Sequence, residues 1–499
     1  MTKAKFVEGS IMRHILVMSS TAAIGISALF VVDLIDIFFL SMLGEQELAA
    51  AVGYAGTISF FTTSIGIGLS IALGALVSRA IGAKQFELAK RLLLNSAVVT
   101  LLVAVLVAII VTIFIPELLA LVGATGHTAD LAADYLYILV PSMPLICLAM
   151  ALGAALRAVG DAKLSMVSTL IGGGVNLVFD PIFIFLLAMG IEGAALASVL
   201  ARIAVLIVAA RGVFIKHNLI GRFDLSWLKE DIRPIFAIAG PAMVTNIATP
   251  IGNAVVTRAI ADFGDSYVAA WAVLGRLTPV AFGMIFALSG AVGPIVGQNF
   301  GAREFERVKE ILMKALLFCG IYVVSLSLLL FLLQEQIVVV FGMQGDGAEL
   351  IRFFCSYIAV FFVFSGALFV ANASFNNLGK AKYSTLFNVG KATLGTIPFV
   401  YYGAQWGGVQ GVLIGQVMGS IVFGILGVWT AFHLVDKVQS TRLFTSYEKD
   451  EFDDLNEELS VSSSNPLSSS CAQMAQLSEE QDCEESTRAT ELVVGQRQD

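Results

Sequence analysis

Three aspartates stand inside long apolar runs of this chain, where a charged side chain is costly. They are Asp33 and Asp36 in the first apolar run and Asp180 in the fifth. The other acidic residues before position 438 fall in loops or near the ends of apolar runs. Ionisable groups at membrane depth are expensive and usually serve ion binding or transport. We therefore expect these carboxyl groups to bind a coupling cation.

Helical spacing places the candidate ligands at a common depth. Asp36 and Asp180 each lie seven residues before the expected end of a span, and Ser198 lies seven residues after the start of one. At a rise of 1.5 Å per residue, all three lie about 10 Å below the outer surface. Asn176 is four residues from Asp180 and shares its helix face, and Asp33 is three residues from Asp36. The spacing predicts one cluster of carboxyl, amide and hydroxyl groups.

Such a cluster has a definite chemistry. Neighbouring carboxyl groups in a dehydrated site cannot all ionise cheaply, so they should titrate as a coupled set. The cluster can hold a proton, or it can hold Na⁺ with oxygens of Asn176 and Ser198 completing the shell. The alternative interpretation is a hydrogen-bonded aspartate that only stabilises helix contacts, and it applies most strongly to Asp33.

The elements that carry these residues are membrane-spanning helices. Of the 499 residues, 57% are hydrophobic and 14% are charged, whereas soluble proteins carry about 25% charged residues. A membrane span needs about 20 apolar residues, and the chain supplies twelve such runs, so the predicted fold is all-α and polytopic. The expected spans are 15–43, 49–78, 93–115, 132–157, 164–187, 191–213, 235–259, 268–297, 312–333, 350–375, 384–403 and 408–433.

The positions of lysine and arginine predict the orientation. Alternate connections carry basic clusters, for example Lys84 with Lys90 and Arg157 with Lys163, while the intervening connections carry acids or no charge. Basic loops remain on the cytoplasmic side. Both termini are therefore expected in the cytoplasm, with the protein integral to the plasma (inner) membrane.

The second half of the chain repeats the first at an offset of 219 residues. The segment 82–87 (GAKQFE) aligns with 301–306 (GAREFE), and the same offset relates Gly160 to Gly379 and Lys163 to Lys382. Each copy holds six spans, so we expect two pseudo-symmetric lobes related by an axis along the membrane normal, an arrangement found in transporters. The expected regions are 1–14 (cytoplasmic N-terminus), 15–213 (N-lobe), 214–234 (cytoplasmic linker), 235–433 (C-lobe) and 434–499 (disordered acidic cytoplasmic tail).

The repeat does not extend to the acids. The equivalents of Asp33, Asp36 and Asp180 are Gly252, Val255 and Phe399, so one lobe is expected to carry the ion chemistry. Two spans, 49–78 and 268–297, are rich in glycine and serine. Small residues allow close helix packing, and they also allow bending.

Several residues could contact a substrate. Arg276 lies in the middle of a span and could pair with substrate, or its long side chain could reach water or a backbone carbonyl. Arg202 and Lys391 are interpreted as buried partners or as side chains that extend to the membrane surface. A broad apolar cavity could be lined by Phe60, Phe61, Met243 and Met284.

Composition excludes other classes. Residues 438–499 hold 14 acidic and 4 basic residues, and no basic patch for nucleic acid exists outside short loops. The five cysteines lack the spacing of a zinc site or a disulfide framework. The motifs HExxH, GxSxG, GxGD and GxxxxGK[ST] do not occur, so we expect no enzyme. We also expect no cofactor other than the coupling ion, H⁺ or Na⁺, and function as a monomer.

Two motifs resemble the multidrug and toxic compound extrusion (MATE) family. Ile35-Asp36-Ile37-Phe38, with Leu43-Gly44 and Leu48-Ala49-Ala50, is similar to the family's first-helix pattern. The second motif is Arg157-Ala158-Val159-Gly160-Asp161-Ala162-Lys163, followed by Asn176, Asp180-Pro181 and Gly193-Ala194-Ala195. The resemblance implies two six-helix lobes around an outward cleft and export of organic, often cationic compounds driven by H⁺ or Na⁺. By motif it implies a cation site at Asp36, Asn176, Asp180 and Ser198, with Tyr135 as a neighbour.

The chain also departs from the family pattern. No acid occurs in the seventh span around residues 241–246, which looks more like the DinF branch than the NorM branch. The first span lacks the family's usual early proline, so Gly25 is the hinge we would expect in its place. The expected function is a drug/cation antiporter. The alternatives are a flippase for lipid-linked precursors of the same superfamily and, further away, a membrane protein that does not transport.

Overall fold

The computed structural model describes residues 4–43 and 46–463. For Asp33, a few other helical positions and residues 442–463, only the backbone is described. The first half contains α1 (Ile11–Ser41), α2 (Gln46–Gly82), α3 (Phe86–Ile113), α4 (Ile115–Leu121), α5 (Gly126–Leu139), η1 (Val140–Ser142), α6 (Met143–Ala158), α7 (Ala162–Pro181), η2 (Ile182–Leu186), α8 (Gly190–Ala210) and η3 (Arg211–Lys216). The second half contains α9 (Leu225–Ala261), α10 (Asp265–Ala281), α11 (Gly283–Gly301), α12 (Phe305–Val340), α13 (Gly345–Phe353), η4 (Phe354–Ile358), η5 (Ala359–Phe361), α14 (Phe362–Asn377), α15 (Lys382–Ala392) and α16 (Ile397–Ser463).

The described helices account for the twelve predicted spans. Ten helical segments are long and apolar enough to cross a membrane, and α10 with α11, bent by 45°, makes an eleventh. The last of the ten, Lys382–Thr441, contains a chain reversal at Gly407 and Gly408, where the backbone leaves the helical region and φ of Gly408 is 57°. On either side of this reversal the backbones of Gly403 and Gly411 are in contact. This segment therefore crosses twice.

The backbone repeats at the offset of 219 found in the sequence. The short helices η1 and η5 and the following helices α6 and α14 begin and end at equivalent positions. Turn residues match as well, since Lys84 (φ 59°) and Arg303 (φ 64°) share the left-handed conformation, as do Gly160 (83°) and Gly379 (74°). α9 begins at Leu225, within the segment expected as a linker.

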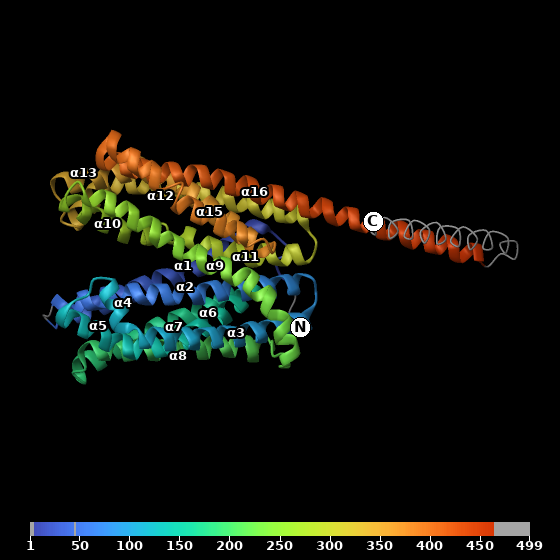
Figure 1. The fold of residues 1–499 in the computed structure, drawn as a ribbon, viewed down its shortest axis with the longest axis horizontal. Coiled ribbons are helices and arrows are strands. Elements are labelled where there is room, and N and C mark those ends of the chain that lie inside the picture. Colours follow the sequence, from blue (N-terminus) through green and yellow to red (C-terminus); the bar gives the residue numbers. More distant parts are fainter. Residues whose placement is uncertain (1–3, 44–45, 464–499) are drawn as a thin grey trace, which may run out of the picture. The chain divides into compact units, whose positions relative to one another are not determined.

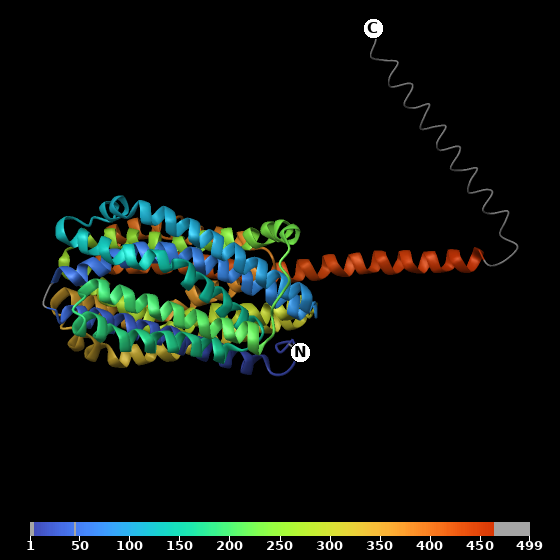
Figure 2. The same cartoon turned by 90° about the horizontal axis from the view of Figure 1, so that it is seen from below.

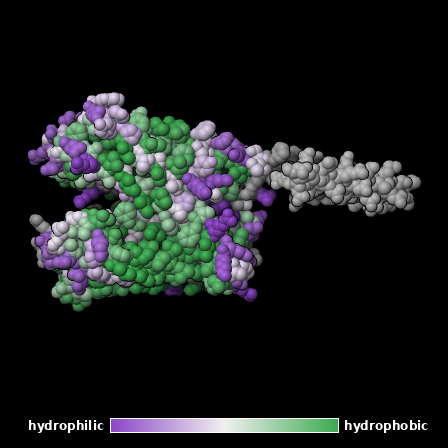
Figure 3. All heavy atoms as spheres, in the orientation of Figure 1, coloured by the Kyte–Doolittle hydropathy of each residue, from purple (hydrophilic) through white to green (hydrophobic). Residues whose placement is uncertain are grey.

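The helices form two lobes. Figure 1 shows α2 to α8 together in one half, and α10, α12, α13, α15 and α16 in the other. Figure 2 shows the helices running side by side along the long axis of the bundle. In Figure 3, hydrophobic atoms form a broad band across both lobes between two polar ends, and a hollow separates the lobes at the end opposite the N-terminus. We call the end with the N-terminus the terminal end, and the other the far end.

At the terminal end, α2 and α11 cross in a pseudo-symmetric contact. A Cβ added at Gly82 would overlap the backbone of Gln298, and one added at its repeat equivalent, Gly301, would overlap the backbone of Arg79. Gln298 and Arg79 are themselves equivalent under the repeat. Gly82 and Gly301 lie just beyond the glycine- and serine-rich spans 49–78 and 268–297; within them, Gly297 packs equally closely, because a Cβ added there would overlap Ser78 of α2.

The N-terminal segment seals the same end. Phe6 is 2% exposed; its N–H donates to Gln298 Oε1 (2.8 Å), and its carbonyl accepts from Asn299 Nδ2 (3.1 Å). Lys5 Nζ donates to the Gly160 carbonyl (3.0 Å), and Gln298 Nε2 donates to the Ala158 carbonyl (2.7 Å). Residues 5 and 6 therefore contact both lobes at once.

The acidic tail belongs to a separate unit, Asp436–Asp499. Its backbone continues α16 as far as Ser463, whereas the sequence led us to expect no regular structure from residue 434. Residues 464–499 lie outside the described residues, and disorder there stays a prediction.

Candidate functional site

Two helices bring the predicted cation ligands together. α1 carries Asp36, and α7, which packs against α1, carries Asn176 and Asp180 one turn apart. Asn176 Nδ2 donates to Asp36 Oδ1 and to Asp180 Oδ2, both at 2.8 Å. Asn176 is 3% exposed and Asp180 is fully buried. The amide thus bridges the two carboxyl groups inside the N-lobe.

The two carboxyl groups also lie within hydrogen-bonding reach of each other. Carboxylate oxygens are acceptors only, so a hydrogen bond between two carboxyl groups requires one of them to carry a proton. Asp180 Oδ1 is buried and accepts no hydrogen bond from the described residues. The site therefore offers an oxygen with unused acceptor capacity beside a second carboxyl group.

Tyr135 and Ser198 form a second polar pair close to this site. Tyr135 on α5 lies beside Ser198 on α8 and close to both Asp36 and Asp180. Tyr135 thus lies beside the cluster, as expected. Ser198 lies beside Tyr135, and its expected role as a cation ligand stays a prediction. The side chain of Asp33 lies outside the described residues, and its role stays a prediction.

Arg202, one turn beyond Ser198 on α8, is held by the protein. Its Nη1 donates to the Leu139 carbonyl (3.0 Å) and to Ser142 Oγ (2.8 Å). The sequence left open whether Arg202 is a buried partner or extends to the membrane surface, and the structure gives it two acceptors inside the N-lobe.

The site could hold an alkali cation but offers few metal ligands. Among the side chains that are described, no group of three or more His, Cys, Asp or Glu lies close enough to hold a metal ion. Two carboxyl groups and one amide remain as oxygen donors, and the amide turns its nitrogen toward both acids. This arrangement suits a proton directly, and Na⁺ after rotation of the Asn176 amide.

The predicted substrate residues are spread over both lobes. Met243 on α9 packs against Gly68 on α2, at an interlobe contact. Phe60 and Phe61 on α2 are 48% and 40% exposed and lie edge to face, with ring centroids 6.3 Å apart. Met284 on α11 is half-buried and Arg276 on α10 is exposed. No described contact joins these residues into one site.

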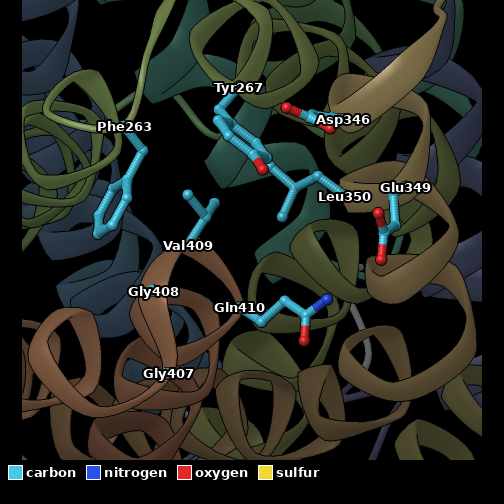
Figure 4. Close-up of a pocket in the computed structure, with 9 residues that line it drawn as sticks. All are labelled: Phe263, Tyr267, Asp346, Glu349, Leu350, Gly407, Gly408, Val409 and Gln410. Carbon is cyan, nitrogen blue, oxygen red and sulfur yellow. The ribbon is translucent and has the colours of Figure 1, made fainter.

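A cavity of about 270 Å³ lies elsewhere, at the far end of the C-lobe. Figure 4 shows Tyr267, Asp346, Glu349 and Gln410 around its opening. Its lining residues all belong to the C-lobe and include none of the carboxyl pair. Sequence reasoning did not identify it, because its residues come from three separate far-end turns.

The sequence left open the partner of Lys391 on α15. Its Nζ donates to Ser365 Oγ on α14 at 3.0 Å. The sequence indicated Lys391 as a candidate because it is a basic residue in mid-span, but no pattern in the sequence identifies Ser365 as its partner.

Comparison with known proteins agrees with this geometry. A two-lobed bundle of twelve spans with carboxyl groups buried in one lobe is typical of membrane transporters. The family model MatE matches residues 22–182 and 241–402, and the chain belongs to this family of multidrug and toxic compound extrusion transporters.

Relatives match over nearly their whole length. The chain is 26% identical over 435 residues to a FAD transporter of Shewanella oneidensis, covering 86% of this chain and 96% of that protein. It is 22% identical over 438 residues to the multidrug export protein MepA of Staphylococcus aureus, covering 87% and 96%.

Solved structures share the fold. A MOP superfamily transporter from Pyrococcus furiosus matches with a TM-score of 0.81 at 22% identity, covering 87% of this chain and 98% of that one. A Vibrio cholerae MATE transporter matches with a TM-score of 0.80 at 24% identity, covering 86% and 97%. The predicted fold and family are confirmed.

Proposed function

We propose that this MATE transporter exports organic compounds in exchange for H⁺, and that Asp36, Asn176 and Asp180 form the coupling site. The observation that carries the proposal is the amide-bridged pair of carboxyl groups, which are within hydrogen-bonding reach inside an apolar lobe. A proton held between them removes one negative charge and joins α1 to α7. Na⁺ in the same site is the alternative that the experiment below separates.

The position of α1 links the site to the opening of the lobes. α1 packs against α7 in the N-lobe and against α11 in the C-lobe. When the proton leaves, two carboxylates face each other at close range, and their repulsion favours separation of α1 from α7. Because α11 forms the terminal-end crossing with α2, a shift of α1 changes the packing that keeps that end closed.

Orientation follows from charge. The turns at the terminal end carry Lys84, Arg157 and Arg303, so the positive-inside rule makes this end cytoplasmic. The hollow at the far end then faces outward, ready to release substrate and take up a proton. One proton moved across 100 mV supplies about 2.3 kcal/mol, enough for a roughly forty-fold substrate gradient.

The names of the relatives suggest which compounds to test. One is called a FAD transporter and another a multidrug export protein. We therefore choose ethidium, a cationic dye, and FAD, a phosphate-bearing flavin, as the first probes.

The test is uptake of ethidium and FAD into everted membrane vesicles under an imposed pH gradient or an imposed Na⁺ gradient. We expect the pH gradient to drive uptake by the wild-type protein, and Asp36→Asn or Asp180→Asn to abolish it. Asp130→Asn, an exposed carboxyl group on α5, is the matched control and should transport normally. Full activity of Asp36→Asn would refute the assignment, and drive by the Na⁺ gradient alone would replace H⁺ by Na⁺.

A further inference from the structure

The membrane spans of the C-lobe contain no carboxyl group. The sequence has no Asp or Glu between 231 and 262, between 265 and 304, between 310 and 335, or between 349 and 436. Two basic residues nevertheless lie in mid-span, Arg276 on α10 and Lys391 on α15. Lys314, nearer the start of α12, is paired with Glu310. The spans of the C-lobe therefore carry basic side chains without a carboxyl counter-ion, and of the two in mid-span only Lys391 is half-buried, since Arg276 is exposed.

Lys391 is incompletely satisfied by its surroundings. The side chain is half-buried, and Ser365 Oγ is the hydrogen-bond acceptor that the described residues offer it. An ammonium group has three donors, so two of them have no acceptor within the described protein. Arg202 in the N-lobe differs, because both a backbone carbonyl and a hydroxyl accept from it.

Lys391 stands at one end of a polar seam between α14 and α15. Ser384, Asn388 and Lys391 follow at helical spacing along one face of α15. Ser384 Oγ donates to Asn376 Oδ1 on α14 at 3.1 Å, and Asn388 is 7% exposed. This seam leads from the terminal end toward the middle of the lobe and ends at the ammonium group.

The lysine is peculiar to the C-lobe. Its repeat equivalent is Gly172, whereas Ser384 is matched by Ser165 and Asn388 by Thr169. In the N-lobe, Ser165 Oγ accepts from Arg157 Nη1 at 3.0 Å, the counterpart of the Ser384 contact. The polar contact near the terminal end is thus common to both lobes, whereas a lysine at this helix position occurs in the C-lobe and not in the N-lobe.

We propose that Lys391 anchors an anionic group, a carboxylate or a phosphate, of the transported compound inside the C-lobe. An unpaired ammonium at membrane depth is costly, and a bound anion supplies the missing counter-charge and acceptors. The inference rests on the proposed transport function and extends it to the charge of the substrate. It gives the lobes separate tasks, with cation coupling in the N-lobe and recognition of substrate charge in the C-lobe.

The experiment compares FAD, which carries a diphosphate and an adenosine, with riboflavin, which carries neither. Purified protein is titrated with FAD and with riboflavin, which lacks phosphate, and binding is followed by flavin fluorescence. We expect the wild-type protein to bind FAD at least about tenfold more tightly, the scale of one charged hydrogen bond. Lys391→Met should remove this preference, and Lys391→Arg should keep most of it. Lys382→Met, an exposed lysine at the start of the same helix, is the matched control.

The outcomes separate the two proposals. Equal binding of FAD and riboflavin by the wild-type protein, or an unchanged preference in Lys391→Met, would overturn the anion site. Lys391→Met should still accumulate ethidium under a pH gradient, whereas Asp36→Asn should not. If no variant transports but the FAD preference depends on Lys391, the transport mechanism fails and the anion site stands. Ser365→Ala keeps the charge of Lys391 and should keep the preference for FAD. If Lys391→Met misfolds, loss of the preference in Ser365→Ala would still contradict the proposal.

Discussion

The two lobes share one backbone plan but differ in the ionisable side chains of their spans, because carboxyl groups occur in the N-lobe spans and not in the C-lobe spans. The N-lobe places Asp36, Asn176 and Asp180 together, while the C-lobe has Val255, Gly395 and Phe399 at the equivalent positions. Where the N-lobe has Gly172, the C-lobe has Lys391. The turns and the terminal-end crossing are alike in the two lobes, because each lobe contributes one of the two glycines that let the helices close that end. The sites proposed above for the coupling ion and for the substrate anion both lie where the repeat diverged.

The strongest test of this contrast removes the bridging amide. Asn176→Leu deletes both hydrogen bonds to the carboxyl groups, each of a kind worth about 1.5–3 kcal/mol. We expect ion-driven uptake to fall at least about tenfold, measured in everted vesicles. Asn246→Leu, which removes a half-buried amide of the C-lobe that donates only to its own helix, should retain most activity. Equal losses in the two variants would contradict an ion site confined to the N-lobe.

The shared part of the lobes is tested at the terminal-end crossing. Gly82→Ala and Gly301→Ala each add a Cβ that overlaps the backbone of the opposite lobe. Both should force this end apart and reduce uptake several-fold, to a similar extent because the contacts are pseudo-symmetric. Spin labels on the two lobes, read by pulsed EPR, should report longer distances across this end. Gly240→Ala, with open space around it, should match the wild-type protein; unchanged distances in the first two variants would refute the crossing.

A smaller effect is expected at the N-terminal segment. Phe6→Ala removes a buried ring that lies between the lobes. Removing a buried phenylalanine ring lowers the free energy of unfolding by about 3–5 kcal/mol. We expect a lower unfolding temperature and faster hydrogen exchange of residues 5–9, with a loss of uptake smaller than in the glycine variants. Lys5→Met removes one exposed hydrogen bond and serves as the control. Normal exchange in Phe6→Ala would show that the segment does not hold the lobes together.

The smallest effect concerns Asp161, in the turn before α7. Burial raises its pKa, but hydrogen bonds from Lys216, His217 and the Leu164 N–H outweigh burial and leave the pKa lowered. The ionised form therefore stabilises the fold above the ordinary pKa of about 4, and this contribution is lost as pH falls through the lower, folded-state value.

Asp161→Asn keeps a helix-capping side chain and loses the ion pair with the exposed Lys216. At neutral pH it should cost no more than about 1 kcal/mol. Unfolding temperatures measured from pH 6 to pH 3 should fall less steeply for this variant than for the wild-type protein. Parallel curves would show that this carboxyl group contributes nothing to the acid sensitivity.

The sequence was most informative where one residue type at one spacing has few explanations. Aspartates in apolar runs predicted the contact between Asp36 and Asp180, and the offset of 219 predicted the two lobes. It also predicted two spans on either side of Gly407 and Gly408. The sequence did not predict short polar contacts between distant segments. The hydrogen bonds from Lys391 to Ser365 and from the Phe6 N–H to Gln298 leave no periodic pattern in the sequence.

Other expectations remain open. Helix α1 continues without interruption through Gly25, so the hinge expected there stays a prediction. The expected substrate residues could not be located from sequence as a single group, because exposed aromatic and methionine side chains face lipid as readily as a cleft.

The most direct test of the central claim is proton release on substrate binding. Ethidium is added to purified protein in weakly buffered solution with a pH indicator, at a pH where the carboxyl pair holds its proton. The account predicts that the wild-type protein releases a proton when substrate binds, and that Asp36→Asn and Asp180→Asn release none. Equal release from the wild-type protein and both variants, or binding without release in a protein that transports under a pH gradient, would contradict it.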